Sequence, residues 1–295
     1  MSSIERYIDK LANAETAQHI PRDGSQEVRL FEQPLEGGGE VVTSATVQEV
    51  NIDFEYLRQA GMLTPQDAKG LLADEYRAIK RPLLKNAFGQ GVLDIPHGNL
   101  IMLTSALPGE GKSFTAINLA MSMAMELDRT VLLVEADVVK PSICKYLGVP
   151  EPEQGLVEYL AKPGLELSNL LLKTNVPKLT LLPAGKQHSS SSELLSSKNM
   201  RELMDQLSSR YSDRVVIFDS PPLLLTTEAT ILSGFMGQIV LVVEAGKTQQ
   251  SVVKQALDLL DPNQIIGVIL NKNMTSAGSS YGYYGSYGSY GAERG

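Results

Sequence analysis

The sequence has 295 residues, of which 43% are hydrophobic and 20% charged, enough chain for one sizeable folded core plus flanking segments. Its formal net charge of -8 at pH 7 argues against non-specific nucleic-acid binding, so we expect no nucleic-acid partner. Cys144 is the only cysteine, which excludes an intrachain disulfide and a multi-cysteine metal site and leaves a buried structural thiol as the expected state.

Residues 1–70 are predicted to form a flexible N-terminal arm or linker. After a short helix-like stretch at 3–12, prolines and the three glycines at 37–39 interrupt any helical or strand periodicity. The apolar stretch at 53–62 is interpreted either as a local docking helix or as a stray amphipathic turn. Residues 1–23 lack the apolar core of a secretory signal, and no apolar run is long enough to span a membrane, so a cytoplasmic location is expected.

Residues 71–275 are predicted to form one α/β domain. Apolar residues at helical spacing across 71–84 predict a helix that leads into the core. Short β-prone runs then alternate with helix-length segments, which is typical of a mostly parallel, P-loop NTPase-like sheet with helices on both faces. The expected strands are residues 100–104, 130–134, 179–182, 215–218, 239–243 and 265–270.

Residues 276–295 form a third predicted region, a tail made almost entirely of Gly, Ser and Tyr. Such a composition does not bury a core. The tail tyrosines are Tyr281, Tyr283, Tyr284, Tyr287 and Tyr290.

A phosphate-binding loop follows the strand predicted at 100–104. Residues 106–113 read Ala-Leu-Pro-Gly-Glu-Gly-Lys-Ser and lead into a helix-like segment, which is the context of a Walker A motif, with Ala in place of its first Gly. Backbone N–H groups and the helix N-terminus would surround the phosphates, Lys112 would bridge the outer ones, and Ser113 would bind Mg²⁺. The expected nucleotide-binding residues here are Pro108, Gly109, Glu110, Gly111, Lys112, Ser113 and Phe114.

Two further strand ends offer carboxylates opposite this loop. Asp219 follows four apolar residues, as in a Walker B element. The end of a parallel strand is also where ligands bind in open α/β sheets. The alternative is that Asp219 only caps a helix or forms a turn. Glu135 and Asp137 alternate along an extended chain and would project from the same side. We expect Ser113, Glu135, Asp137 and Asp219 as metal ligands and Lys112, Asp137 and Asp219 as catalytic residues, with a carboxylate near 135–137 as base for a tyrosine hydroxyl.

Together these motifs resemble the bacterial tyrosine kinases, the P-loop kinases of exopolysaccharide synthesis, and among them the autokinases that accompany exosortase systems. The matching residues extend from Asp74 to the C-terminus. They are 74–84, 105–113, 131–142, 182–185, 193–195, 218–222, 245–248 and the tyrosine cluster. The family's second acidic motif usually reads Asp-x-Asp-x-Arg, whereas this chain has Glu135, Asp137 and Val139, which lengthens one arm of the metal site and removes a charge.

The resemblance implies an ATP- and Mg²⁺-dependent protein-tyrosine kinase that phosphorylates its own tail tyrosines in trans, within a homo-oligomer whose subunit contact uses Asp74, Arg77 and Lys80. It implies regulation of exopolysaccharide polymerisation or export. The implied partners are a tyrosine phosphatase and a separate, membrane-embedded chain-length determinant that activates the kinase and recruits it to the inner membrane. Asn271, after the last strand, lies where related P-loop proteins contact adenine; an ordinary strand-end Asn is the alternative.

Two other functions remain open. An ATPase switch of the kind that positions plasmids or division sites would share the fold, but such proteins commonly carry an extra lysine where this chain has Leu107, and they do not need a tyrosine-rich tail. A non-catalytic nucleotide-binding scaffold of the export machinery would use the tail only as a sticky linker. Phosphotyrosine formation separates the kinase from both.

Overall fold

The computed structural model describes residues 48–67, 69–89, 95–162, 164–188, 190–210 and 213–273. The strands are β1 (Gln48–Val50), β2 (Leu100–Ser105), β3 (Thr130–Glu135), β4 (Leu172–Thr174), β5 (Leu179–Leu182), β6 (Arg214–Asp219), β7 (Gln238–Glu244) and β8 (Ile265–Asn271). The helices are α2 (Phe54–Gln59), α3 (Leu71–Ala87), α4 (Lys112–Ala124), α5 (Ile143–Leu147), α6 (Leu156–Ala161), η1 (Leu167–Asn169), α7 (Ser191–Leu195), α8 (Lys198–Ser209), α9 (Thr227–Ser233) and α10 (Gln250–Leu257).

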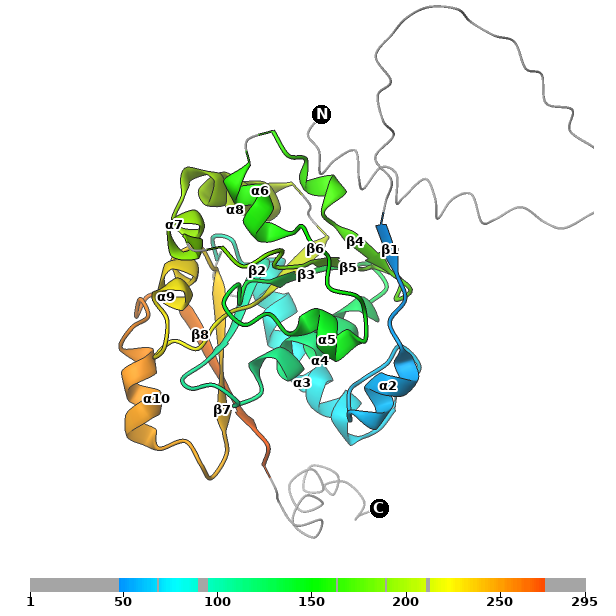
Figure 1. Cartoon of the computed structure of the whole chain (residues 1–295). Helices are drawn as coiled ribbons and strands as arrows, with labels where there is room; N and C mark the ends of the chain where they lie inside the picture. Colours follow the sequence, from blue (N-terminus) through cyan, green and yellow to red (C-terminus); the bar gives the residue numbers. More distant parts are fainter. Residues whose placement is uncertain are drawn as a thin grey trace, which may run out of the picture.

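All eight strands belong to one sheet, in the order β1-β4-β5-β3-β6-β2-β7-β8. Helices cover both faces of this sheet (Figure 1), and within the described chain only the β4–β5 pair is antiparallel. The mostly parallel α/β fold predicted from the alternating pattern is therefore confirmed. The six predicted strands all form, each within one residue of its expected bounds.

Two hydrophobic clusters, one on each face of the sheet, make the core. All six residues of β2 are buried, as expected of a central parallel strand covered on both sides. Because successive side chains point to opposite faces, Leu100 and Met102 join one cluster while Ile101 and Leu103 join the other. The first cluster includes residues of α6, α8 and α9, and the second includes residues of α2, α3 and α4.

The carboxyl ends of β2, β3 and β6 lie at one edge of the sheet. In the strand register, Asp219 at the end of β6 pairs with Leu103 of β2 on one side and with Glu135 of β3 on the other. The loops that follow these three strands therefore start next to one another, which brings the phosphate-binding loop and the predicted carboxylates together.

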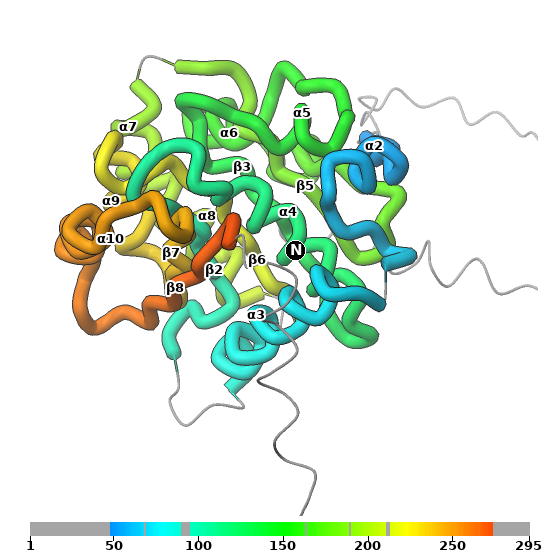
Figure 2. Tube along the Cα trace, turned by 90° about the horizontal axis from the view of Figure 1, so that it is seen from below, coloured from blue at the N-terminus to red at the C-terminus, as the bar shows by residue number. Residues whose placement is uncertain are grey.

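The folded body begins earlier than the predicted boundary between residues 70 and 71. β1 pairs in parallel with β4, and the side chain of Asn175 bonds the backbone N–H and carbonyl of Ile52. Asp53 caps α2 by accepting hydrogen bonds from two backbone N–H groups, and Leu57 is fully buried. Residues 48–67 thus belong to the domain, and α2 packs beside α5 on this same chain (Figure 2).

The remaining parts of the predicted arm, residues 1–47, and the tail, residues 276–295, lie outside the described residues. Where the structure describes the chain, it shows no helix with both the length and the apolar character needed to cross a bilayer.

A chain that starts at residue 71 is expected to be less stable than one that starts at residue 48, because it uncovers the core beneath Ile52, Leu57 and Met62. Each fully buried apolar side chain contributes about 1.5 to 3 kcal/mol to the free energy of unfolding. Urea unfolding of the two truncated chains measures the difference. As a single substitution, Leu57→Ala should cost about 2 to 5 kcal/mol, whereas Leu127→Ala, at a position 85% exposed, is the matched control. Equal stability of the two truncated chains would show that residues 48–67 add nothing to the fold.

Candidate active site

The loop between β2 and α4 has the backbone conformation of a phosphate-binding loop. Gly109 and Gly111 have φ angles of 84° and 99°, a region that favours glycine. Gly111 also has no space for a side chain, since an added Cβ would lie 2.0 Å from Nδ2 of Asn271. Gly111 is the N-cap of the 13-residue helix α4, so the first N–H groups and the positive end of the helix dipole face the loop.

The side chain of Glu110 stabilises this loop through hydrogen bonds. Its carboxylate is buried, accepts a hydrogen bond of 2.7 Å from the backbone N–H of Leu107, and also accepts from the hydroxyl of Thr248. The Glu110 side chain therefore points away from the loop interior, and only its backbone can take the predicted nucleotide contact. Thr248 belongs to the matched segment 245–248, and the sequence offered no signal for its role.

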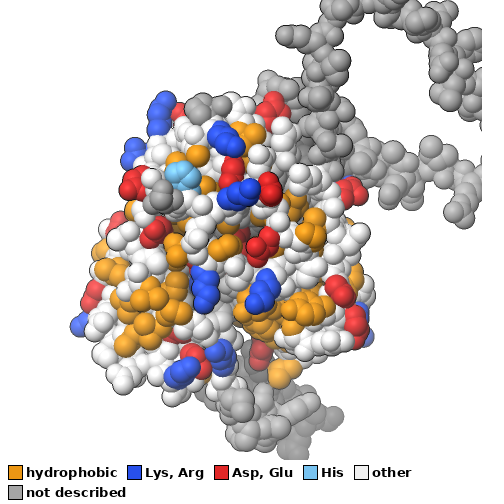
Figure 3. Space-filling model, in the orientation of Figure 1, with side chains coloured by type: hydrophobic (Ala, Val, Ile, Leu, Met, Phe, Trp, Pro, Cys, Tyr) orange, Lys and Arg blue, Asp and Glu red, His pale blue; other side chains and the backbone are white. Residues whose placement is uncertain are grey.

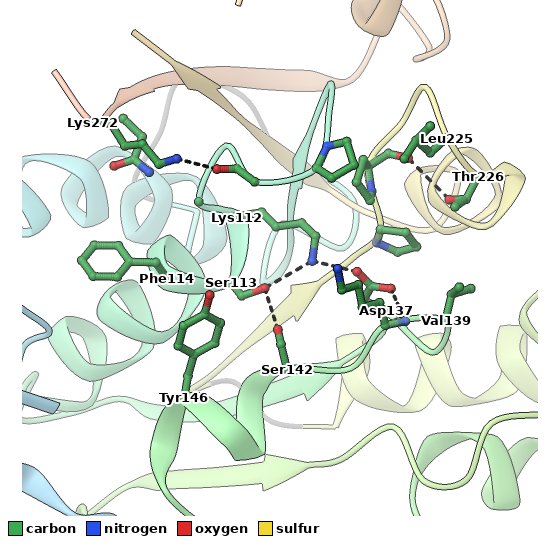
Figure 4. Close-up of a pocket in the computed structure, with 17 residues that line it drawn as sticks. Lys112, Ser113, Phe114, Asp137, Val139, Ser142, Tyr146, Leu225, Thr226 and Lys272 are labelled. Atoms are coloured by element: carbon green, nitrogen blue, oxygen red, sulfur yellow. Dashed lines mark hydrogen bonds and ion pairs between the residues drawn. The ribbon is translucent and has the colours of Figure 1, made fainter. Parts of the chain in front are cut away.

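Lys112 lies at the centre of an acidic cluster. Its Nζ is 2.8 Å from Oδ2 of Asp137 and 3.2 Å from Oγ of Ser113 (Figure 4). Oδ1 of Asp219 lies 3.5 Å from the same Nζ. Burial opposes the charge on Lys112, but Asp219 and Asp137 outweigh it and raise the pKa of the amine. The structure thus brings Lys112, Ser113, Asp137 and Asp219 to one place, as expected from the sequence.

Asp219 is the most deeply buried member of this cluster. It has no solvent exposure, and its Oδ2 atom has no hydrogen-bond partner among the described residues. Burial raises the pKa of Asp219, and the nearby Lys112 opposes that rise. An unpaired buried carboxylate oxygen beside a serine hydroxyl and a phosphate-binding loop is suited to a cation.

Glu135 has a different set of contacts from the one expected of a metal ligand. Its Oε2 accepts hydrogen bonds from the backbone N–H groups of Ser142 at 2.9 Å and Ile143 at 2.5 Å. Burial, followed by the charge of Asp219, raises the pKa of Glu135 to about 8. Glu135 therefore anchors the loop after β3, and its role as a metal ligand stays a prediction.

Ser142 is a site residue that sequence reasoning did not single out. Its hydroxyl lies 3.0 Å from that of Ser113 and it lines the same cavity. The only signal for it was its position at the end of the matched segment 131–142. Nearby, the thiol of Cys144 is buried, as predicted, and burial raises its pKa to about 12.

A cavity of about 850 Å³ opens above the cluster, a volume in the usual range for small-molecule sites. Asn271 lines it at the end of β8, where its side-chain amide donates a 2.8 Å hydrogen bond to the Glu110 carbonyl. Its predicted contact with adenine stays a prediction.

The next residue, Lys272, donates to the Gly109 carbonyl at 2.6 Å and pairs with Glu244 at 3.2 Å. The end of β8 is therefore bound directly to the phosphate-binding loop.

The cluster fits Mg²⁺ that arrives together with a nucleotide better than a resident metal ion. No three His, Cys, Asp or Glu side chains in the described ranges gather so as to hold a metal by themselves. Mg²⁺, however, usually takes one or two carboxylates and keeps its waters and the substrate phosphates as further ligands. Ser113, Asp137 and the unpaired oxygen of Asp219 match that requirement.

The three residues expected at the subunit contact do not share one surface. Asp74 and Arg77 form an exposed ion pair on α3, but Lys80 is only 6% exposed, donates to the Ser122 carbonyl and pairs with Glu126. The reason is helical geometry: six residues at about 100° each leave Lys80 about 120° around the helix from Asp74. In this chain Lys80 packs against α4, and its expected role in a subunit contact stays a prediction.

Comparison with known proteins identifies the family. A family profile described as an AAA domain matches residues 98–262, more than half of the chain. The tyrosine-protein kinase YwqD of Bacillus subtilis is 33% identical over 227 residues, which cover 76% of this chain and 91% of that protein. The chain belongs to the bacterial tyrosine kinases. It is 34% identical to the tyrosine-protein kinase wzc of Salmonella typhimurium over 189 residues, but these span only 26% of that longer relative.

Solved structures agree with this assignment. The kinase domain of the Escherichia coli tyrosine kinase ETK is 26% identical, with a TM-score of 0.60, and the match covers 75% of this chain and 81% of that one. The chimerical protein CapA2B2 is 26% identical, with a TM-score of 0.61. The match covers 77% of this chain and 93% of that one. The septum site-determining protein MinD of Pyrococcus horikoshii, at 23% identity and a TM-score of 0.50, shares the fold alone. This bacterial tyrosine kinase is therefore an enzyme built on a nucleotide-binding P-loop fold.

Glu135→Asp is expected to loosen the loop after β3, because the shorter side chain reaches less well toward Ser142 and Ile143. The single cysteine reports the change, since Cys144 lies next to Ile143 and is buried. A typical hydrogen bond contributes about 0.5 to 1.5 kcal/mol, so iodoacetamide labelling of Cys144 should accelerate about 2- to 10-fold. Glu153→Asp, at an exposed position, is the control. An unchanged labelling rate would argue that Glu135 does not anchor this loop.

Lys112→Met is expected to lower the free energy of unfolding by about 3 to 5 kcal/mol at neutral pH, because it leaves Asp137 and Asp219 buried without their cation. The loss should shrink as the pH falls. Lys112 opposes the rise in the folded-state pKa of Asp219, so its removal raises this pKa further, and the variant gains more stability than the wild type as the pH drops toward the ordinary Asp value. Urea unfolding over this pH range measures the effect. Lys140→Met, at an exposed lysine of the same cavity, should change stability little at any pH.

Proposed function

We propose that this kinase transfers the γ-phosphoryl group of ATP to tyrosines of its own C-terminal tail, and that the tail of one subunit enters the active site of a neighbour. The observation that carries the proposal is the contact of Lys112 with Asp137, Asp219 and Ser113 on the floor of the cavity. A cation, two carboxylates and a hydroxyl beside a phosphate-binding loop are the groups that phosphoryl transfer requires.

Each residue of the site has a role that its position supports. MgATP supplies the phosphoryl group and the charge neutralisation. The N–H groups around Gly109 and Gly111 bind the phosphate oxygens, and Lys112 binds the outer phosphates. Asp219 and Ser113 would hold Mg²⁺. Asp137, whose carboxylate borders the cavity, accepts the proton that the tyrosine hydroxyl loses as its oxygen bonds to phosphorus.

The position of the tail supports self-phosphorylation. Lys272 lines the cavity, and Tyr281 follows it after nine residues. That length of chain spans at most about 30 Å, so the tyrosines lie within reach of the active-site region of their own or an adjacent subunit. Phosphorylation of all five tyrosines would add about -1.5 to -2 charges each to a chain already at -8. The resulting repulsion would release the modified tail.

The wider role rests on the resemblance of the motifs. We propose that tail phosphorylation regulates the polymerisation or export of an exopolysaccharide in an exosortase-associated system. A membrane-embedded chain-length determinant on a separate chain would activate the kinase and recruit it from the cytoplasm to the inner membrane, and a tyrosine phosphatase would reset the tail. Asp74 and Arg77 would contribute to the contact between subunits.

The first test is incubation of the full chain with MgATP, followed by mass spectrometry of every tyrosine-containing peptide. Phosphotyrosine within residues 273–295 is expected. The inactive control is Lys112→Arg rather than Lys112→Met, because it keeps a cation beside the buried carboxylates, while the longer, planar guanidinium does not take the position of the compact ammonium. ATP hydrolysis without phosphotyrosine would favour the ATPase switch, and neither activity would favour the scaffold.

A mixing experiment tests transfer between subunits. The Lys112→Arg chain, with its tail intact, is combined with an active chain whose five tail tyrosines are replaced by phenylalanine. Phosphotyrosine on the Lys112→Arg tail is the expected result. Modification of the wild-type tail alone, with none in the mixture, would assign the reaction to a single subunit.

A further inference from the structure

The cavity has an apolar wall on the side away from the expected nucleotide. Figure 4 shows Val139 and Leu225 on one side of the Lys112–Asp137 contact, with Phe114 and Lys272 on the other. Both Val139 and Leu225 line the cavity, and they are 45% and 61% exposed. More widely, hydrophobic side chains gather in patches on this face of the molecule, with Lys or Arg side chains between them (Figure 3).

Hydrogen bonds hold both ends of this wall in place. The carbonyl of Val139 accepts a 3.0 Å hydrogen bond from the side chain of Gln187, and the next N–H, of Lys140, donates to Asp137. The backbone N–H of Leu225 donates to the Pro222 carbonyl at 3.3 Å. Exposed apolar side chains on fixed loops inside a cavity are typical of a surface that a ligand covers.

The chemistry of the chain's own tail matches this wall. Residues 274–292 contain no charged side chain, and the residues flanking each tail tyrosine are Gly, Ser or a second tyrosine. A tyrosine has apolar ring faces and one polar hydroxyl, so the ring can pack on an apolar wall while the hydroxyl reaches a polar group. The wall ends at Asp137, the proposed proton acceptor, and the tail begins beyond Lys272 on the rim of the same cavity.

We propose that Val139 and Leu225 bind the ring of the acceptor tyrosine and select the neutral, glycine- and serine-flanked tyrosines of the tail. The inference rests on the proposed kinase function and adds its acceptor specificity. The side chains of Val139 and Leu225 carry no charge, so the wall itself offers no partner to acidic residues beside an acceptor tyrosine, and the cation of this loop, Lys140, lies next to the wall. The wall therefore contributes apolar contact rather than charge, and the small Gly and Ser neighbours of each tail tyrosine leave its ring free to reach the wall.

The test uses the full chain with Val139 and Leu225 both replaced by serine, and a fluorescent peptide of residues 276–292. Serine removes the apolar contact without adding charge. We expect the dissociation constant of the peptide and the KM for its phosphorylation to rise about 5- to 30-fold, as loss of this much apolar contact predicts. The matched control is Leu127→Ser, at an exposed leucine that does not line the cavity.

A second variant tests selection. Val139→Arg should bind a peptide with glutamates beside its tyrosine better than the wild type does, and the neutral tail peptide less well. Lys140 on the same loop is unchanged, so a change in preference is assigned to position 139. Unaltered peptide affinity in the double serine variant, or unaltered preference in Val139→Arg, overturns the inference.

The binding measurement separates the inference from the proposed function. If the wild type phosphorylates its tail but the serine variant binds the peptide equally well, the kinase proposal stands and the acceptor wall is wrong. If the wild type binds the peptide through this wall but forms no phosphotyrosine, the wall stands and the kinase proposal fails.

Discussion

The contact of Lys112 with Asp137 and Asp219 is the interaction on which the rest of the site depends. A carboxylate as deeply buried as Asp219 is expensive to keep ionised without a cation nearby. Lys112 supplies that cation from the first turn of α4, while Asp219 ends β6 and Asp137 follows β3. One amine thus joins three elements that are distant in the sequence and fixes the phosphate-binding loop against the central strands. Removing its charge therefore affects folding and chemistry together.

The parts of the fold that the sequence predicted are those set by local pattern. β2, β3, β6 and β7 are nearly continuous apolar runs, and the phosphate-binding loop has glycines where its backbone requires them. The sequence did not reveal β1 and β4, because each has three residues and is defined by partners far along the chain. The packing of residues 48–67 was missed for the same reason, since Pro and Gly upstream favoured an unstructured arm.

The site shows the same division between local pattern and tertiary contact. Lys112, Ser113 and Asp219 were found because motif and strand context fix their positions. Glu135 and Asp137 were expected to act on one ion; β3 ends at Glu135, so the two side chains leave the strand differently, and their shared metal role stays a prediction. Asp137 therefore turns to Lys112 and Glu135 to the backbone that follows. Ser142, Thr248 and the inward turn of Lys80 depend on contacts across the fold, which no spacing in the sequence encodes.

The hydrogen bonds from Asn271 and Lys272 to the phosphate-binding loop have a consequence for how this kinase meets its substrate. They fix residues 271 and 272, from which the tail continues, at the mouth of the cavity, so the proposed acceptor would be tethered to its own or an adjacent active site. Its local concentration is set by the length of the tether and, for short flexible linkers, is on the order of millimolar. Under the proposed function, each tyrosine could then bind weakly and still be modified.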